Sequence, residues 1–413
     1  MPRSVRSRLS IAVVALAAFA TAGTLVVHVR ASHQPVHTTE SAPLVPLTTT
    51  GFSEADVRDK DIVFYANRVA EDPESATDRS TLARLQFARS RTSGSVSELA
   101  RAEALARASV ALRTQRNGES FEVLASLLMA RHAFTEARAM AARADSLEPE
   151  TPSHLALLGE IELELGDYAS AAKHFGLVHF DAQQFTVGAR VARWYEVTGR
   201  ADMARAMLKR AIVQVDRRDD LPQEQAAWFH YRLGELELRL GHVTAADSAF
   251  QRGLTRHAND TRILGGLARA ALARGEYARA IAFGDEATAI LLDPTTLGTV
   301  SMAYAALGDS TSAKEYAHAM SVSALTQPGA IHRAWGLYLL DHGSATERAD
   351  VLRRARRDLL ERHDVYGHDL MAWALFRNGH VTQARQEMQL ALAQRTEDVM
   401  LAAHAVAIAS ELP

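Results

Sequence analysis

A glycine that recurs at regular intervals constrains the fold of this chain more than any other sequence feature. Its seven positions are Gly166, Gly199, Gly241, Gly275, Gly308, Gly343 and Gly379. Successive glycines are 33 to 42 residues apart. An apolar residue lies eight positions before each glycine and a small residue lies seven before, and six of the seven have an alanine five positions after. Self-similarity at a period of about 34 residues predicts an array of helix–turn–helix units.

The pattern within one unit has a direct physical explanation. The apolar residues recur at steps of three and four, which places them on one stripe of a first helix. The glycine predicts the end of that helix, because a left-handed turn is easiest for a residue without a side chain. A single helix pair cannot bury its own stripe, so we expect the pairs to stack into an all-α, right-handed solenoid.

Composition excludes several functional classes. The 413 residues carry 46 basic and 49 acidic side chains, a net charge of −3, so no general attraction to nucleic acid is expected. The sequence has no cysteine, which excludes disulfides, thiol catalysis, thiolate metal sites and a lipoprotein anchor.

The unit that begins at Phe121 preserves the repeat pattern best. Its pattern positions are Phe121, Leu124, Ala125, Leu128, Phe134, Ala137, Ala141, Ala144 and Pro149. These residues fall on the spacing W-x2-L-G-x2-Y…A-x3-F…P, so the chain resembles the tetratricopeptide repeat family over residues 78–410. The stretches 61–65 and 369–375 also resemble exported bacterial tetratricopeptide proteins. The resemblance implies a concave inner face that binds extended peptides or helices of a protein partner.

The sequence predicts five segments. Residues 1–30 are predicted to be a signal peptide or membrane anchor, and residues 31–52, rich in Pro and Thr, a flexible linker. Residues 53–117 are predicted to form N-terminal helices with a degenerate repeat, followed by about eight repeats in 118–398. Residues 399–413 are predicted to be a capping helix, and its apolar composition leaves self-association open.

The N-terminal segment has two interpretations. Arg3, Arg6 and Arg8 precede an apolar run over residues 9–29, which predicts insertion into the inner membrane with the rest of the chain on its far side. The small residues at Ala20-Thr21-Ala22 favour cleavage, whereas the length of the run is sufficient for an uncut anchor. Either interpretation predicts an extracytoplasmic protein, periplasmic or secreted, tethered to the membrane in the second case.

The candidate partner-binding residues flank the apolar stripe on the first helix of each unit. They are Glu160, Arg190, Arg193, Trp228, Tyr231, Glu235, Arg262, Arg269 and Trp373. The aromatic residues are candidates for rigid anchors and the arginines for carboxylate recognition. The alternative is that the aromatics belong to the core between repeats. The Lys/Asn pairs with which some family members bind a chaperone's terminal carboxylate do not occur on these helices.

No catalytic motif stands out in the sequence. It lacks HExxH, G-x-S-x-G, a phosphate-binding loop and a Rossmann glycine motif. We therefore expect a non-enzymatic scaffold without cofactor or metal that binds a protein partner. Two further hypotheses are a structural protein of envelope assembly that contacts the cell wall or an outer-membrane complex, and a metal-dependent hydrolase that uses the histidines of the C-terminal half.

Overall fold

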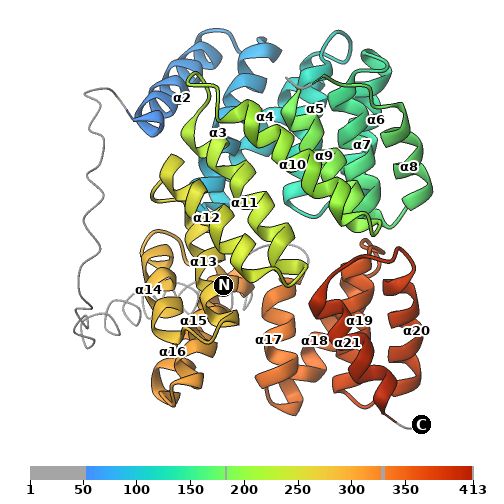
Figure 1. Ribbon diagram of the computed structural model, residues 1–413. Helices are drawn as coiled ribbons and strands as arrows, with labels where there is room; N and C mark the ends of the chain where they lie inside the picture. Colours follow the sequence, from blue (N-terminus) through green and yellow to red (C-terminus); the bar gives the residue numbers. More distant parts are fainter. Residues whose placement is uncertain (1–52, 182–183, 327–330, 412–413) are drawn as a thin grey trace, which may run out of the picture.

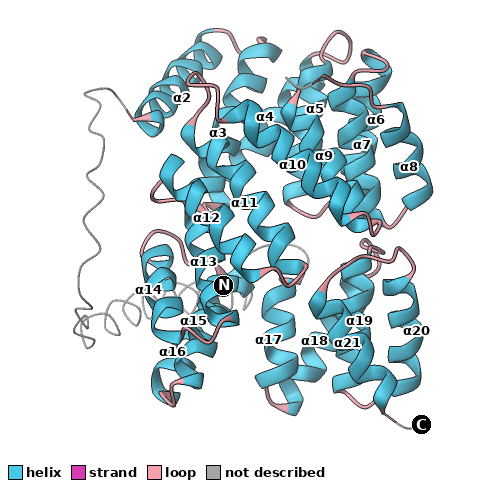
Figure 2. Cartoon of the chain, in the orientation of Figure 1, coloured by secondary structure: helices cyan, strands magenta, loops and turns pink. Residues whose placement is uncertain are grey.

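The computed structural model describes residues 53–181, 184–326 and 331–411, so the predicted leader and linker lie outside the described residues. Every regular element in these ranges is a helix (Figure 2). The first ten are α2 (Glu54–Glu71), α3 (Ala76–Ser93), α4 (Val96–Leu112), α5 (Gly118–Ala130), α6 (Phe134–Leu147), α7 (Pro152–Leu165), α8 (Tyr168–Leu177), α9 (Phe185–Val197), α10 (Ala201–Val215) and α11 (Gln223–Arg239). The others are α12 (Val243–Arg256), α13 (Thr261–Ala273), α14 (Tyr277–Thr288), α15 (Pro294–Ala306), α16 (Ser310–Thr326), α17 (Arg333–His342), α18 (Ala345–Asp358), α19 (Val365–Arg377), α20 (Val381–Leu392) and α21 (Val399–Ser410).

Consecutive helices pair into hairpins that stack side by side. In the described part of the chain the pairs run from α3/α4 to α19/α20, with α2 before the first pair and α21 after the last (Figure 1). This confirms the predicted all-α solenoid. The polar residues 216–222 connect α10 to α11, and this long connection explains the longest gap in the glycine series.

The helices begin and end where local chemistry favours it. Ser53 caps α2 and Ser344 caps α18, each in a reciprocal capping box with the acidic residue three positions later. Six of the seven repeat glycines have positive φ, between 68° and 83°, as predicted. Gly343 differs, with φ −81° and ψ 168°. Its carbonyl accepts a hydrogen bond from Arg348, and the chain passes directly into the Ser344 cap.

The solenoid closes on itself, which the repeat pattern did not predict. The backbone N–H of Val365 donates to the hydroxyl of Tyr168 at 2.8 Å, across 197 residues of sequence. Thr135 donates to Glu361 at 3.0 Å, and Arg58 pairs with Glu224 at 3.1 Å. In Figure 1 the C-terminal helices α19–α21 accordingly lie next to α7 and α8. We call the contact of residues 361–366 and 395–399 with the ends of α7, α9 and α11 the seam.

The seam contains apolar packing in addition to the polar contacts. One continuous hydrophobic cluster includes Leu163 and Val197 of the middle hairpins together with Leu375 and Leu401 near the C-terminus. The backbone comes close there too, since a methyl group added at Gly199 would overlap the carbonyl oxygen of Arg395. At Gly308, which carries the same repeat signature, such a methyl group would have nothing within 4 Å. Glycine is therefore required at Gly199 by its positive φ and by the close approach of Arg395, and at Gly308 by its positive φ alone.

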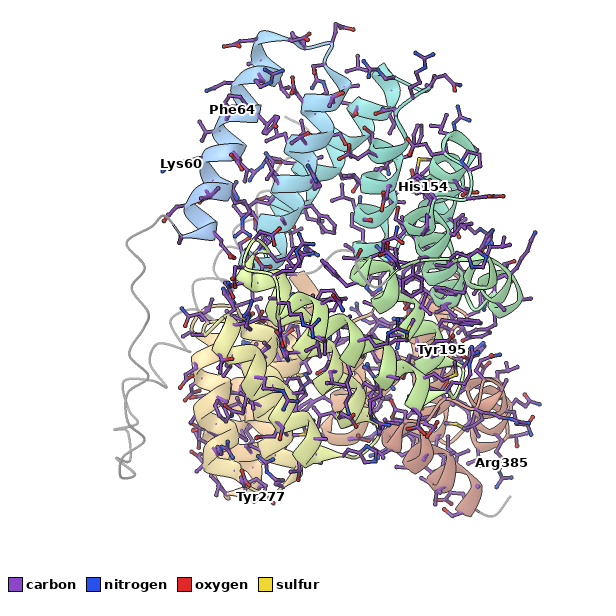
Figure 3. The ribbon with its side chains drawn as sticks, turned by 45° about the horizontal axis from the view of Figure 1, so that its top comes forward. Lys60, Phe64, His154, Tyr195, Tyr277 and Arg385 are labelled. Atoms are coloured by element: carbon purple, nitrogen blue, oxygen red, sulfur yellow. The ribbon has the colours of Figure 1, made fainter. Side chains whose placement is uncertain are left out.

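The two end helices of the array are covered on one side only. Helix α2 buries a single residue, Ile62, against α3. Helix α21 buries Leu401, His404 and Ile408 against α19 and α20. The labelled residues Phe64 of α2 and Arg385 of α20 mark these opposite ends in Figure 3. No helix in the described ranges is long and apolar enough to span a bilayer.

Candidate functional site

Four of the nine predicted residues line one cavity of about 170 Å³ between α11, α13 and the start of α15. They are Tyr231 and Glu235 of α11 and Arg262 and Arg269 of α13. Each pair repeats at a helical spacing, i and i+4 or i and i+7, so both side chains of a pair leave the helix on the same side. The remaining lining residues are Thr261, Gly265, Leu291, Asp293, Thr295 and Thr296.

Two local features shape this cavity. The carboxylate of Asp260 caps α13 by accepting from the backbone N–H groups of Arg262 and Ile263. A methyl group at Gly265 would lie 2.5 Å from Thr296 Oγ1, so glycine allows the start of α15 to approach α13. Gly265 was not among the predicted site residues, and its place in the cavity wall follows from this close packing.

The charged groups of the cavity are already paired. Arg269 donates to both carboxylate oxygens of Glu235, one of them at 3.1 Å, and Arg262 donates to Asp260 at 2.6 and 3.0 Å. Burial would raise the pKa of Glu235, but Arg269, together with Arg239 and Arg232, outweighs burial, and the pKa is lowered. Burial, reinforced by Glu235, raises the pKa of Tyr231 to about 12. These groups hold their protons or charges at neutral pH, so the arrangement suits hydrogen bonding to a polar ligand rather than proton transfer.

The arginines on α9 take part in an internal ion-pair ladder. Glu160 pairs with Arg190, and Arg193 lies 3.7 Å from Glu164 and 3.1 Å from Glu196. The guanidinium of Arg193 also lies 5.4 Å from the centre of the Tyr366 ring, which α19 contributes across the seam. This end of the predicted binding surface is therefore covered by the C-terminal hairpins.

The centre of the ladder is Glu196, which the sequence analysis did not single out. Its side chain is 3% exposed, and Arg193, Arg232 and Arg239 lie within 2.6 to 3.1 Å of its oxygens. Burial would raise the pKa of Glu196, but Arg239, Arg193 and Arg232 together lower it to about 2. The sequence signal that could have identified Glu196 is its position one helical turn after Arg193, where an acidic side chain can pair with the arginine.

The two predicted tryptophan anchors have different surroundings. Trp228 is half-buried and makes an edge-on contact with Phe229, with 4.9 Å between ring centres. Trp373 is only 8% exposed, stacks on His404 at 4.2 Å and donates to Asp341 at 2.9 Å. Trp373 thus joins the last hairpin to α21 as part of the core, which was the alternative interpretation.

The histidines that suggested a metal site are used in single pairs. His174 Nδ1 lies 2.7 Å from Glu162, and His368 Nδ1 lies 2.7 Å from Glu387. Among residues 53–181, 184–326 and 331–411, no three His, Asp or Glu side chains gather as a metal ion would require. The metal-dependent hydrolase hypothesis therefore gains no support from the described residues.

Within the hairpins, an aromatic ring of the second helix packs against a small residue of the first. A methyl group at Gly159 of α7 would lie 2.6 Å from the Phe175 ring of α8, and one at Gly266 of α13 would lie 2.6 Å from the Phe250 ring of α12. The small residue of the first helix thus receives an aromatic ring from a second helix, as the consensus spacing implies. In this packing the hairpins resemble tetratricopeptide repeats.

Comparison with solved structures returns other proteins with helical repeats. PilW, a type IV pilus biogenesis factor, is 17% identical to this chain with a TM-score of 0.41. The match covers 49% of this chain and 91% of PilW. A tetratricopeptide repeat protein from Parabacteroides merdae is 14% identical over 62% of this chain and 98% of its own, with a TM-score of 0.42. Human IFIT1 is 12% identical over 84% of this chain and 96% of its own, with a TM-score of 0.44. No protein-family model and no curated protein matches the sequence. At these values the likeness does not extend to function.

Proposed function

We propose that this chain is a non-enzymatic, extracytoplasmic tetratricopeptide scaffold that binds a protein partner at the inner-face cavity between α11, α13 and α15. The observation that carries the proposal is the cavity itself, which gathers four of the nine residues expected to contact a partner. Its walls offer guanidinium and hydroxyl groups beside apolar Leu291. Such a mixture orients a polar group of a ligand and buries an apolar one next to it.

The extracytoplasmic part of the proposal rests on the amino-terminal sequence. Arginines before the apolar run at residues 9–29 favour export of the following chain. The absence of cysteine is compatible with an oxidising compartment, since no thiol is exposed to unwanted pairing there. A fusion of residues 1–52 to a periplasm-dependent reporter should be active if the placement is right and inactive if it is wrong.

Filling the cavity should prevent partner binding. Thr295→Trp places a large side chain at the cavity wall, where Thr295 is partly exposed. With a photo-crosslinking residue at Thr261, the wild-type chain should crosslink one partner in intact cells, and Thr295→Trp should lower that product at least about tenfold, equivalent to about 1.4 kcal/mol.

The matched control is Thr244→Trp, an exposed threonine on the outer helix α12. It should leave the crosslinked product unchanged, and both variants should melt close to the wild type. Equal yields from Thr295→Trp and Thr244→Trp, or no specific product from the wild type, would contradict binding at this cavity.

A further inference from the structure

The outer face of α21 is apolar and uncharged, and beyond Val399, which borders the seam at Gly241, it is uncovered. The only ionisable side chain in Val399–Ser410 is that of His404, which is turned inward with Nδ1 2.8 Å from Asp369. The face opposite Leu401, His404 and Ile408 exposes 52% of Val399 and 70% of Val406. Solenoids usually end in a repeat with a polar outer face, because an apolar end face would remain in contact with water.

The exposed residues of α21 follow the spacing of a helix-pairing seam. Val399, Ala402, Val406 and Ala409 are separated by steps of three and four, and all four are exposed. Valine alternates with alanine along this row. In a pair of helices, a larger side chain inserts into the space that small residues of the facing helix leave free.

We propose that two copies of this chain associate by packing α21 antiparallel around a two-fold axis. With the axis near position 404, Val399 lies opposite Ala409 of the partner subunit, and Ala402 lies opposite Val406 of the partner subunit. Every valine then meets an alanine, so the row is complementary to itself. An antiparallel pair also sets the positive end of each helix dipole beside the negative end of the other.

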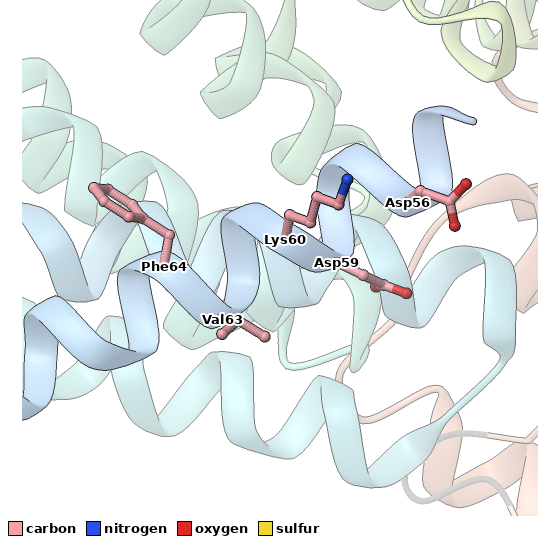
Figure 4. A pocket seen from close by; sticks show the side chains of 5 residues that line it. All are labelled: Asp56, Asp59, Lys60, Val63 and Phe64. Atoms are coloured by element: carbon pink, nitrogen blue, oxygen red, sulfur yellow. The ribbon is translucent and has the colours of Figure 1, made fainter. Parts of the chain in front are cut away.

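A second copy fits this face better than it fits the other exposed helix face. Helix α2 exposes Val63 and Phe64, with Asp56, Asp59 and Lys60 lining the same open hollow (Figure 4). A two-fold contact there would remove the charged groups of Asp56, Asp59 and Lys60 of both copies from water, which is unfavourable. The face of α21 has no charge to repel its own copy.

A lipid surface fits α21 poorly. Helices that lie in a membrane interface combine an apolar face with a polar face rich in Lys and Arg. The other face of α21 is buried in the protein and contains no basic residue other than His404. The pairing also goes beyond partner binding at the cavity, since α21 contributes none of the residues that line it.

The chain has no native cysteine, which allows a direct crosslinking test. With Ala402→Cys and Val406→Cys in the full chain, oxidation of isolated envelopes should yield a disulfide-linked dimer that reductant reverses. The control pair, Thr244→Cys and Ser248→Cys, has the same spacing on exposed positions of α12. A dimer from the α21 pair alone supports the proposal, and equal dimer yields from both pairs, or none, overturn it.

Mass measurement gives an independent readout. The purified full chain should have twice the mass of one chain by light scattering, and Val406→Glu should reduce the mass to that of a single chain. Because 70% of Val406 is exposed, this variant should fold as the wild type does. Val63→Glu on α2, where 61% of the side chain is exposed, should remain dimeric. A single-chain wild type, or a dimeric Val406→Glu, would overturn the proposal.

Discussion

Replacing Glu196 by glutamine should lower the free energy of unfolding at pH 7 by about 3–5 kcal/mol, the usual cost of removing one partner from a buried ionic network. The carboxylate of Glu196 is almost fully buried and compensates Arg193, Arg232 and Arg239. A glutamine has similar size but no charge, so the guanidinium groups would remain close together without their counter-ion. Urea denaturation of the variant and the wild type measures the difference.

The same substitution has a predictable pH dependence. The pKa of Glu196 is lowered from 4.5 in the unfolded chain to about 2 in the folded protein. Its contribution to stability is therefore complete above the unfolded value and is lost as the pH falls through the folded value. The wild type should lose its advantage over Glu196→Gln between these two pH values.

Glu136→Gln is the matched control for this prediction. Glu136 also pairs with an arginine, Arg107, at 2.6 Å, but both side chains are 43% exposed. An exposed pair contributes about 0–1 kcal/mol. If Glu196→Gln is no more destabilising than Glu136→Gln, the Glu196 centre does not stabilise the fold as described.

Alanine at Gly199 should destabilise the protein by about 3 kcal/mol, whereas alanine at Gly308 should cost about 1 kcal/mol. Both glycines have positive φ, 68° and 83°, so both substitutions strain the backbone. Only at Gly199 does the added methyl group also overlap the chain at Arg395. Denaturant unfolding of the two variants compares the strain alone with the strain plus the overlap.

A second measurement connects this effect with the closure of the array. If Gly199→Ala pushes the seam apart, its radius of gyration by small-angle X-ray scattering should rise above that of the wild type, and Gly308→Ala should leave it unchanged. Equal destabilisation by both alanines, with no change in dimensions, would show that the seam adds nothing to the requirement for glycine at this position.

The features that were predictable from the sequence are those that each repeat encodes locally. The apolar stripe and the glycine turn lie within a few positions of one another, so they predicted the hairpins, and the last helix starts at Val399 as predicted. Gly343 shows the limit of such inference, because the adjacent Ser344 cap replaces the left-handed turn. The capping signal was present in the sequence but competed with the repeat signal.

The helical spacing of the candidate residues was readable from the sequence, but their ion pairs and their coverage by other helices were not. Tyr231, Glu235, Arg262 and Arg269 line one cavity, and their spacing within α11 and within α13 depends only on the geometry of single helices. The convergence of Arg232 and Arg239 on Glu196 and the contact of Arg193 with Tyr366 depend on neighbouring helices and on the seam. Contacts between residues so distant in sequence leave no mark in a repeat pattern, so the coverage of this surface was not foreseen.

The closure of the array has a consequence for how the chain acquires its structure. An open solenoid folds from contacts between adjacent repeats, so synthesis or export of a few units is enough to start it, and its ends fray independently. Here the hydrogen bond of Tyr168 with Val365 and the packing of the end of α9 against the segment before α21 can form only when the C-terminal residues are present. Such non-local contacts slow folding and bind distant units into one cooperative transition. Removal of α21 and the segment before it should therefore weaken hairpins near residue 199 as much as those at the terminus.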